Sequence, residues 1–132
     1  MLFALAFWGQ AGLAVLAWGV LLFLFTPQPA ASNLTAQMFV GLGALELPLA
    51  YLLGTLAARG GSQAGALTAA LLEGILLAAP IWFALFTWLI GSPALYPATL
   101  LGAAALFYGL GLLFVGRHSA QAMQNPARSA SL

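Results

Sequence analysis

Four long apolar segments, separated by short runs of glycine, proline and small polar residues, set the pattern of the chain. We expect helices at residues 2–25, 34–58, 63–90 and 93–116. Each is longer than the roughly 20 apolar residues that a helix needs to cross the hydrocarbon core of a bilayer. The pattern therefore predicts an all-α fold, that of a polytopic membrane protein with four transmembrane helices in an up-down bundle.

The boundaries of the first two segments are marked by residues that break or cap helices. Pro27 and Pro29 cannot continue the first helix, and Ser32 or Asn33 is available to cap the second. The first segment contains no Lys or Arg and is about 24 residues long, whereas the apolar part of a secretion signal has about 7 to 15 residues. We therefore interpret residues 2–25 as a retained membrane helix rather than as a cleaved signal.

The boundaries of the last two segments carry similar signals. Ser62 is expected to cap the third helix, which is followed by Gly91. Ser92 is expected to cap the fourth helix, with Pro93 at its first helical position. The loops before and after the third helix are therefore predicted to be short.

Composition agrees with a membrane location. Hydrophobic residues make up 64% of the 132 residues and charged residues 4%, and the mean hydropathy is +1.06. Soluble domains typically carry about 25% charged residues. A net charge of +1 is too small for a nucleic-acid partner. The chain has no cysteine and no catalytic or cofactor-binding motif, so we expect no enzyme activity, no cofactor and no metal site.

All basic residues fall on one side of the expected topology. Arg59 follows the second helix, and Arg117 and Arg128 lie in residues 117–132, after the transmembrane domain of residues 1–116. Because loops rich in positive charge stay in the cytoplasm, we expect cytoplasmic N and C termini and a polar cytoplasmic tail at residues 117–132. The expected location is the bacterial cytoplasmic (inner) membrane, with the lipid bilayer as the immediate partner.

The only two acidic residues of the chain, Glu46 and Glu73, lie within apolar segments. Ionisable side chains at membrane depth are costly and mark functional sites. With a rise of about 1.5 Å per residue, Glu46 lies roughly 18 Å and Glu73 roughly 14 Å from the cytoplasmic ends of their helices. No lysine is present, and burial without a cation favours the neutral form of a carboxyl. We predict that both residues bind a proton or another ion.

Small residues on the same helix faces indicate that both carboxyls point inward. Gly43, Glu46 and Ala50 share one face of the second helix, and Ala69 and Glu73 share one face of the third. Membrane helices pack closely where small residues line a face, so each glutamate is expected to face another helix rather than lipid. The fourth helix carries glycines at seven-residue spacing, which predicts a further packing face.

Three further polar residues lie near the same depth. Gln10 and Tyr108 come out about 12 Å from the cytoplasmic ends of their helices, and Tyr51 is close to that level. We expect them to form a supporting polar layer around the glutamates. The alternative is that Gln10 and Tyr108 form interhelical hydrogen bonds with a purely structural purpose. Depth alone does not decide between the two because it does not fix helix rotation.

Pro48 and Pro80 lie within the second and third helices, in the neighbourhood of the two glutamates. A proline inside a helix removes one backbone hydrogen bond and clashes with the carbonyl four residues earlier, so we expect kinks at both positions. Interrupted helices beside ionisable groups often mark a cavity or gate in transporters. Proline also occurs in membrane helices that it only bends, and both interpretations stay open.

Two classes of function fit these features. The first is a small proton- or cation-coupled transporter or channel that uses Glu46 and Glu73. The second is a non-catalytic accessory or assembly subunit of a larger membrane complex, in which the glutamates bond to partner helices. A four-helix chain has little room to enclose a pathway, so either class predicts a homo-oligomer or a larger membrane complex.

Overall fold

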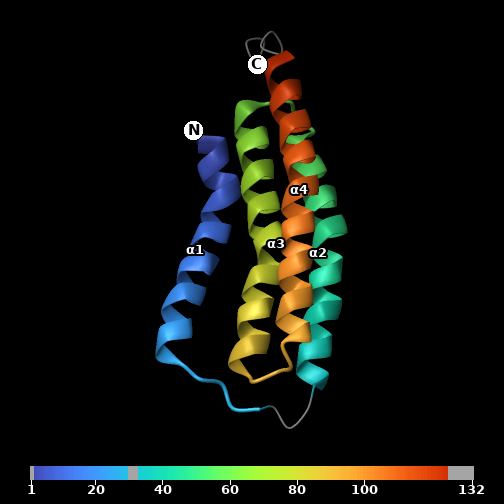
Figure 1. The fold of residues 1–132 in the computed structure, drawn as a ribbon. Helices are drawn as coiled ribbons and strands as arrows, with labels where there is room; N and C mark the ends of the chain where they lie inside the picture. Colours follow the sequence, from blue (N-terminus) through green and yellow to red (C-terminus); the bar gives the residue numbers. More distant parts are fainter. Residues whose placement is uncertain (1, 30–32, 125–132) are drawn as a thin grey trace.

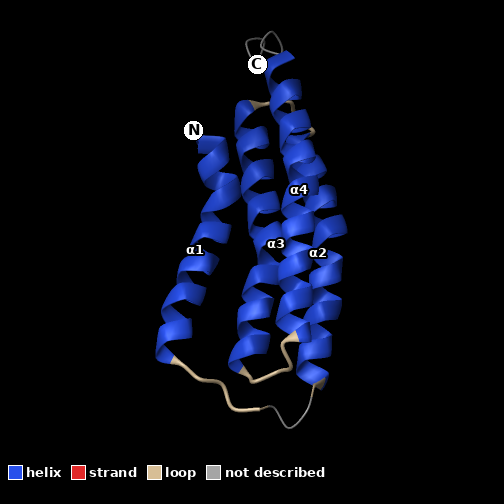
Figure 2. Cartoon of the chain, viewed as in Figure 1, coloured by secondary structure: helices blue, strands red, loops and turns tan. Residues whose placement is uncertain are grey.

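The computed structural model describes residues 2–29 and 33–124, and all regular structure within them is helical (Figure 1). Figure 2 shows only helices and loops in this part of the chain. The helices are α1 (Leu2–Leu24), α2 (Leu34–Ala58), α3 (Gln63–Leu89) and α4 (Leu95–Gln124). Each contains a stretch that is long and apolar enough to cross a membrane. The expected all-α fold with four apolar helices is thus confirmed, and it is compatible with an integral membrane protein.

Most helix boundaries agree with the local signals in the sequence. Helix α2 has the expected bounds, and α1 and α3 each end one residue earlier than expected. Ser62 is the N-cap of α3, and its Oγ accepts a hydrogen bond from the Gly65 amide at 3.0 Å. Asn33 is the N-cap of α2 without a capping hydrogen bond from its side chain. Ser32, the other candidate, lies outside the described residues.

The turn between α3 and α4 differs from the expectation at Ser92. The Ser92 amide donates to the Thr87 carbonyl at 3.0 Å, and the Gly91 amide donates to the Trp88 carbonyl at 2.9 Å. Gly91 has a φ of 74°, a left-handed conformation that favours glycine. These features form the Schellman motif that closes the C-terminus of a helix. Ser92 therefore closes α3 instead of capping α4, which begins later than expected, at Leu95.

Helix α4 continues to Gln124, well beyond its expected end at residue 116. Its apolar residues continue to Val115, so the last turns of α4, from Arg117 onward, extend past the segment expected to cross a membrane. Residues 117–124, which we expected in a polar tail, contain no proline and are rich in alanine, glutamine and other residues that favour helices. The rest of the expected tail, residues 125–132, lies outside the described residues.

Helix α3 lies at the centre of the molecule and packs against α1, α2 and α4 (Figure 1). Helices α2 and α4 also pack against each other, while α1 flanks α3 on the side away from α2. Figure 1 shows the first residues of α1 and the last residues of α4 at the same end of the molecule. Among the described helices α3 carries the most buried residues. The core is therefore built around one helix rather than around the axis of a symmetric bundle.

Helix α1 buries one narrow stripe, formed by Phe7, Ala11, Ala14 and Trp18 at three- and four-residue spacing. Trp18 also donates from its indole nitrogen to the Ile81 carbonyl of α3 at 3.3 Å. The remaining surface of α1 carries exposed leucine, valine and phenylalanine side chains. Such a surface suits contact with lipid or with another apolar helix.

The backbones of α1 and α3 touch at Gly74. A Cβ atom added at Gly74 would lie 2.6 Å from the Ala6 carbonyl oxygen and 2.7 Å from the Phe7 carbonyl oxygen. Real Cβ atoms essentially never approach other atoms so closely. Glycine at this position therefore sets the distance between the two helices.

We expect Gly74→Ala to push α1 away from α3, because the obstructing atoms belong to the α1 backbone and cannot rotate aside. Overpacking of this kind costs about 1–3 kcal/mol of unfolding free energy. Gly109→Ala in α4 is the matched control, since nothing lies within 4 Å of a Cβ added there. Unfolding of both variants in detergent micelles, followed by circular dichroism, measures the difference. Equal stability of the two variants would contradict the proposed contact.

Candidate functional site

Glu73 is completely buried, with 0% of its surface exposed. It extends from α3 toward α2, where a Cβ atom added at Gly54 would lie 2.7 Å from the Glu73 Cδ and 2.8 Å from its Cγ. The carboxyl group therefore occupies the space that a side chain at residue 54 would take. Helix α2 accommodates a buried acid because it carries a glycine at the point of contact.

The helical neighbours of Glu73 on α3 are small or aliphatic. On α3, Ala69 and Ala70 lie one turn before Glu73 and Leu77 lies one turn after it, and all three are buried. On α2, Ala50 lies one turn from Gly54 and is 0% exposed. No cluster of three or more His, Cys, Asp or Glu residues that could hold a metal ion occurs within residues 2–29 and 33–124.

Glu46 has a different environment from Glu73. It is half-buried on α2, and its Oε2 atom is buried without a hydrogen-bond partner within the described residues. One turn before it, Gly43 lies where α2 meets both neighbours, since an added Cβ would be 2.8 Å from Leu100 of α4 and 3.9 Å from Pro80 of α3. Glu46 thus lies next to a three-helix contact, with part of its side chain on the outer surface.

Contacts between α2 and α3 fix their relative register. A Cβ atom added at Gly65, near the start of α3, would lie 2.7 Å from the carbonyl oxygen of Ala57, near the end of α2. Farther along, Gly43 of α2 lies against Pro80 of α3. Residue numbers rise on one helix as they fall on the other, so α2 and α3 are antiparallel.

This register separates the two carboxyl groups. It places the Glu73 backbone level with about Ala50, four residues or about 6 Å along the helix axis from Glu46. Side chains in a helix lean toward its N-terminus, and the helices are antiparallel, so the two carboxyls lean in opposite directions. Gly54, which contacts the Glu73 carboxyl, is eight residues or about 12 Å from Glu46 along α2. The glutamates are therefore two sites rather than one pair that shares a proton.

Tyr108 lies at a junction of three helices rather than beside either glutamate. Its buried hydroxyl donates from α4 to the Gly74 carbonyl at 3.2 Å and to the Phe7 carbonyl at 3.4 Å. Its ring stacks on Trp8 with a centroid distance of 4.8 Å and meets the Phe7 ring edge to face at 5.2 Å. These contacts give Tyr108 the interhelical role that we weighed as its structural alternative.

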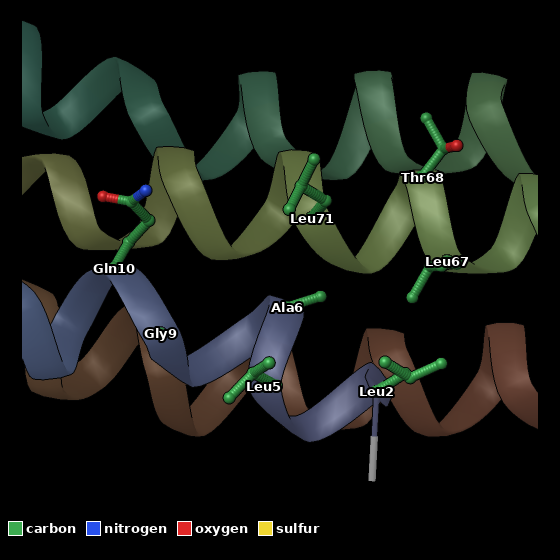
Figure 3. Close-up of a pocket in the computed structure, with 8 residues that line it drawn as sticks. All are labelled: Leu2, Leu5, Ala6, Gly9, Gln10, Leu67, Thr68 and Leu71. Atoms are coloured by element: carbon green, nitrogen blue, oxygen red, sulfur yellow. The ribbon is translucent and has the colours of Figure 1, made fainter.

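Gln10 and Tyr51 also lie apart from a common polar layer. Gln10 lines an open groove of about 400 Å³ between α1 and α3, together with Thr68 and several leucines (Figure 3). Figure 3 shows the Gln10 side chain extending from α1 toward α3, on a different face of α3 from the one that meets α2. Tyr51 is 50% exposed on α2, at about the level of the Glu73 backbone. Of the polar residues predicted to support the glutamates, Tyr51 is thus the one on α2, the helix that the Glu73 side chain contacts.

The two helix prolines lie in continuous helices. Pro48 is exposed on α2, and Pro80 is buried on α3 next to Gly43. Each removes one backbone hydrogen bond without ending its helix. The kinks expected at these positions stay a prediction, and the α2–α3 contact extends past both prolines.

Sequence reasoning did not single out Gly54. The signal for it was present, because Gly54 lies on the face of α2 that also carries Gly43 and Ala50. Only the register of α2 on α3 shows that this glycine, rather than another small residue of that face, receives the Glu73 carboxyl.

We expect Gly54→Ala to destabilise the protein by about 1–3 kcal/mol, because the new methyl group overlaps the Glu73 carboxyl. In a Glu73→Ala background the same methyl group fits the vacated space. There it is expected to be neutral or stabilising, since alanine favours a helix over glycine by about 1 kcal/mol. A double-mutant cycle of unfolding free energies in micelles measures this coupling. Additivity of the two substitutions within about 0.5 kcal/mol would show that the residues do not interact.

Tyr108→Phe keeps the buried ring and removes only the hydroxyl. Interhelical hydrogen bonds in membrane proteins contribute about 0.6 kcal/mol on average and up to about 1.7 kcal/mol. We expect a loss of stability in this range, together with weaker attachment of α1, because both acceptors lie at the contact between α1 and α3. Hydrogen exchange of the α1 amides in wild type and variant measures the second effect, and unchanged exchange would contradict it.

No protein-family model, curated protein or solved structure matches the chain. The function must therefore be argued from the side chains themselves. The feature with most chemical content is a carboxyl buried between two apolar helices, with a second carboxyl nearer the surface of the same helix pair.

Proposed function

We propose that the chain is an integral membrane protein that transports protons or cations, as a small coupled transporter or channel, with Glu46 and Glu73 as its ion-binding residues. The observation that carries this proposal is the contact between the buried Glu73 carboxyl and Gly54. An ionisable group at membrane depth is costly, and such groups mark ion or substrate pathways. Here the neighbouring helix provides space for the carboxyl at the expense of a side chain of its own.

The proposal assigns the helices a direction in the membrane. They alternate across the bilayer, with both termini and the loop at Arg59 in the cytoplasm, since the three arginines of the chain then lie on one side. The membrane is proposed to be the inner membrane of a bacterium. The polar end of α4 then extends into the cytoplasm beyond the lipid head groups.

Transport in this protein is proposed to require a homo-oligomer or a larger membrane complex. Glu73 is enclosed between α2 and α3, whereas Glu46 has part of its side chain at the surface of the same pair. The outer faces of the helices carry large apolar side chains that can contact lipid or further helices. In α4, Gly102 and Gly109 have open space where a side chain would be, so the glycine face predicted from the sequence remains available for a second copy.

Purified protein in sealed liposomes tests the proposal. With an imposed pH gradient or membrane potential, we expect wild type to conduct protons or cations and Glu73→Gln to reduce the flux to that of empty liposomes. Glutamine keeps the shape of glutamate but cannot ionise. Glu46→Gln is expected to reduce the flux as well. Gly19→Ala in α1 serves as the control that leaves it unchanged, since nothing lies within 4 Å of a Cβ atom added there.

The competing function is that of an accessory or assembly subunit. It predicts no flux from wild type under any gradient, and stable co-purification of defined membrane partners whose association is lost in Glu46→Gln or Glu73→Gln. Size-exclusion chromatography and circular dichroism of each variant separate these outcomes from misfolding. Flux that persists in both glutamine variants would eliminate the proposed role of the carboxyls.

A further inference from the structure

We infer that two copies of the chain associate across an exposed face of α3, and that Gln10 of each copy pairs with Glu46 of the other. The second copy thus contributes a residue to the site at Glu46. This inference deepens the proposed function, and it rests on that proposal for the direction of the helices in the membrane. It follows from two polar side chains that lie at the same level on helices either side of α3.

One face of α3 stays exposed among the described helices. It carries the side chains of Leu71, Ile75 and Phe86, which are separated by four and eleven residues and so share one side of the helix. Leu71 also lines the groove between α1 and α3, and Phe86 stacks on Phe39 of α2 with a centroid distance of 6.1 Å. Figure 3 shows α1 and α2 on opposite sides of α3. The exposed face therefore lies between α1 and α2.

Gln10 lies at the α1 edge of this face. Its side chain lines the same groove as Leu71 and extends toward α3 (Figure 3). The Gln10 amide makes no hydrogen bond within residues 2–29 and 33–124. An amide without a partner is costly at membrane depth, because hydrocarbon replaces the water that would otherwise bind it. The amide therefore has two N–H donors and one acceptor available to another molecule.

Glu46 lies at the α2 edge of the same face. It is seven residues, or about two turns, from Phe39, so both side chains lie on one flank of α2. Its Oε2 atom has no hydrogen-bond partner within the described residues, and part of its side chain is at the surface. A carboxyl group accepts hydrogen bonds whether or not it is protonated. It therefore complements the N–H donors of Gln10.

Gln10 lies at the level of about Leu77 of α3. The α1 backbone at Phe7 meets Gly74 of α3. Figure 1 shows α1 and α3 running in the same direction, so residue numbers rise together on the two helices. Three residues farther along each helix, Gln10 is level with about Leu77.

Glu46 lies at this level as well. The register of α2 on α3 places the Glu73 backbone level with about Ala50. The two helices are antiparallel, so moving back four residues on α2 to Glu46 corresponds to moving forward four residues on α3 to Leu77. The backbones of Gln10 and Glu46 thus lie within about one helical turn of the same depth.

A two-fold axis along the membrane normal satisfies both residues at once. The three arginines all lie on one side of the proposed topology, so two copies share one direction in the membrane and such an axis can relate them. The axis turns the α1 edge of one copy toward the α2 edge of the other and keeps every residue at its depth. Gln10 of each copy then faces Glu46 of the other, with the exposed faces of α3 between the two pairs.

A second copy fits this face better than lipid does. Lipid chains can cover the apolar side chains of α3, but they offer Gln10 and Glu46 no hydrogen-bonding group at their depth. A second copy covers the same side chains and supplies a donor and an acceptor at the required level. Membrane helices associate through this combination of close packing and interhelical hydrogen bonds.

Crosslinking in liposomes tests the arrangement, and the chain has no native cysteine to interfere. Gln10→Cys protein and Glu46→Cys protein, carrying different tags, are mixed in micelles and reconstituted together. With a short bifunctional thiol reagent, we expect a crosslinked product between the two variants and little product from either variant alone. Each mixed dimer keeps one native pair of Gln10 and Glu46 on the other side of the axis.

Two outcomes of this experiment would overturn the inference. Product from either variant alone, with none between the two, would show that like edges meet. Efficient crosslinking of Gly109→Cys protein to itself, with no product between the Gln10→Cys and Glu46→Cys proteins, would place the second copy on the glycine face of α4 instead.

A second measurement determines whether the polar pair stabilises the dimer. Fluorescent labels attached to Ile75→Cys protein report association by energy transfer while both polar residues are native. Adding Gln10→Leu or Glu46→Leu removes both symmetric hydrogen bonds, and bonds of average strength predict a rise of about sevenfold in the dimer dissociation constant. Gln28→Leu, in the loop after α1, is the matched control expected to leave the constant unchanged. Circular dichroism confirms that each variant is folded, and an unchanged constant in both test variants would overturn the pairing.

The two proposals fail in different ways. Liposomes without flux would contradict transport, while crosslinking between Gln10→Cys and Glu46→Cys proteins would still support the dimer. Flux that depends on Glu46, in protein that shows neither this crosslinking nor energy transfer, would support transport and overturn the contribution of a second copy to the site.

Discussion

The contacts of one turn of α3 hold the described helices together. Glu73 extends from this turn to Gly54 of α2, while the next residue, Gly74, lies against the α1 backbone at Phe7. The Gly74 carbonyl also accepts a hydrogen bond from Tyr108 of α4. Helices in a bilayer associate through close packing and interhelical hydrogen bonds rather than through the hydrophobic effect. Both kinds of contact meet at this turn, which explains why α3 occupies the centre.

The positions of the helices could be predicted from sequence because the thickness of a bilayer dictates their length and local residues mark their ends. Ser62 caps the N-terminus of α3, as its hydroxyl and its position before an apolar run predict. Ser92 did not, although its side chain suits an N-cap, because its amide and that of Gly91 complete the C-terminal motif of α3. The end of α4 was also misplaced, since residues 117–124 combine a polar composition with helix-favouring residues and composition alone does not separate the two.

The arrangement of side chains around the site could be predicted only in part. Counting residues from the helix ends gave similar depths for the glutamates, for Gln10 and for Tyr108, but it contains no information on rotation about each helix axis. The structure directs Gln10 to a groove and Tyr108 to backbone carbonyls. The inward direction of Glu73 followed from its small neighbours, whereas the role of Gly54 depends on the register between two helices.

The position of Gly74 directly after Glu73 restricts rotation of α3 about its own axis. Rotation of α3 about its axis would separate Gly74 from the α1 backbone. It would also break the hydrogen bond between the Tyr108 hydroxyl and the Gly74 carbonyl. Neither of these two contacts of Gly74 involves α2. The short link from α2 to α3 contains Gly60 and Gly61, and Gly61 has a φ of 62°, a conformation that favours glycine. Adjacent residues of one helical turn thus fix α3 to α1 and α4 on one side and direct the Glu73 carboxyl to α2 on another.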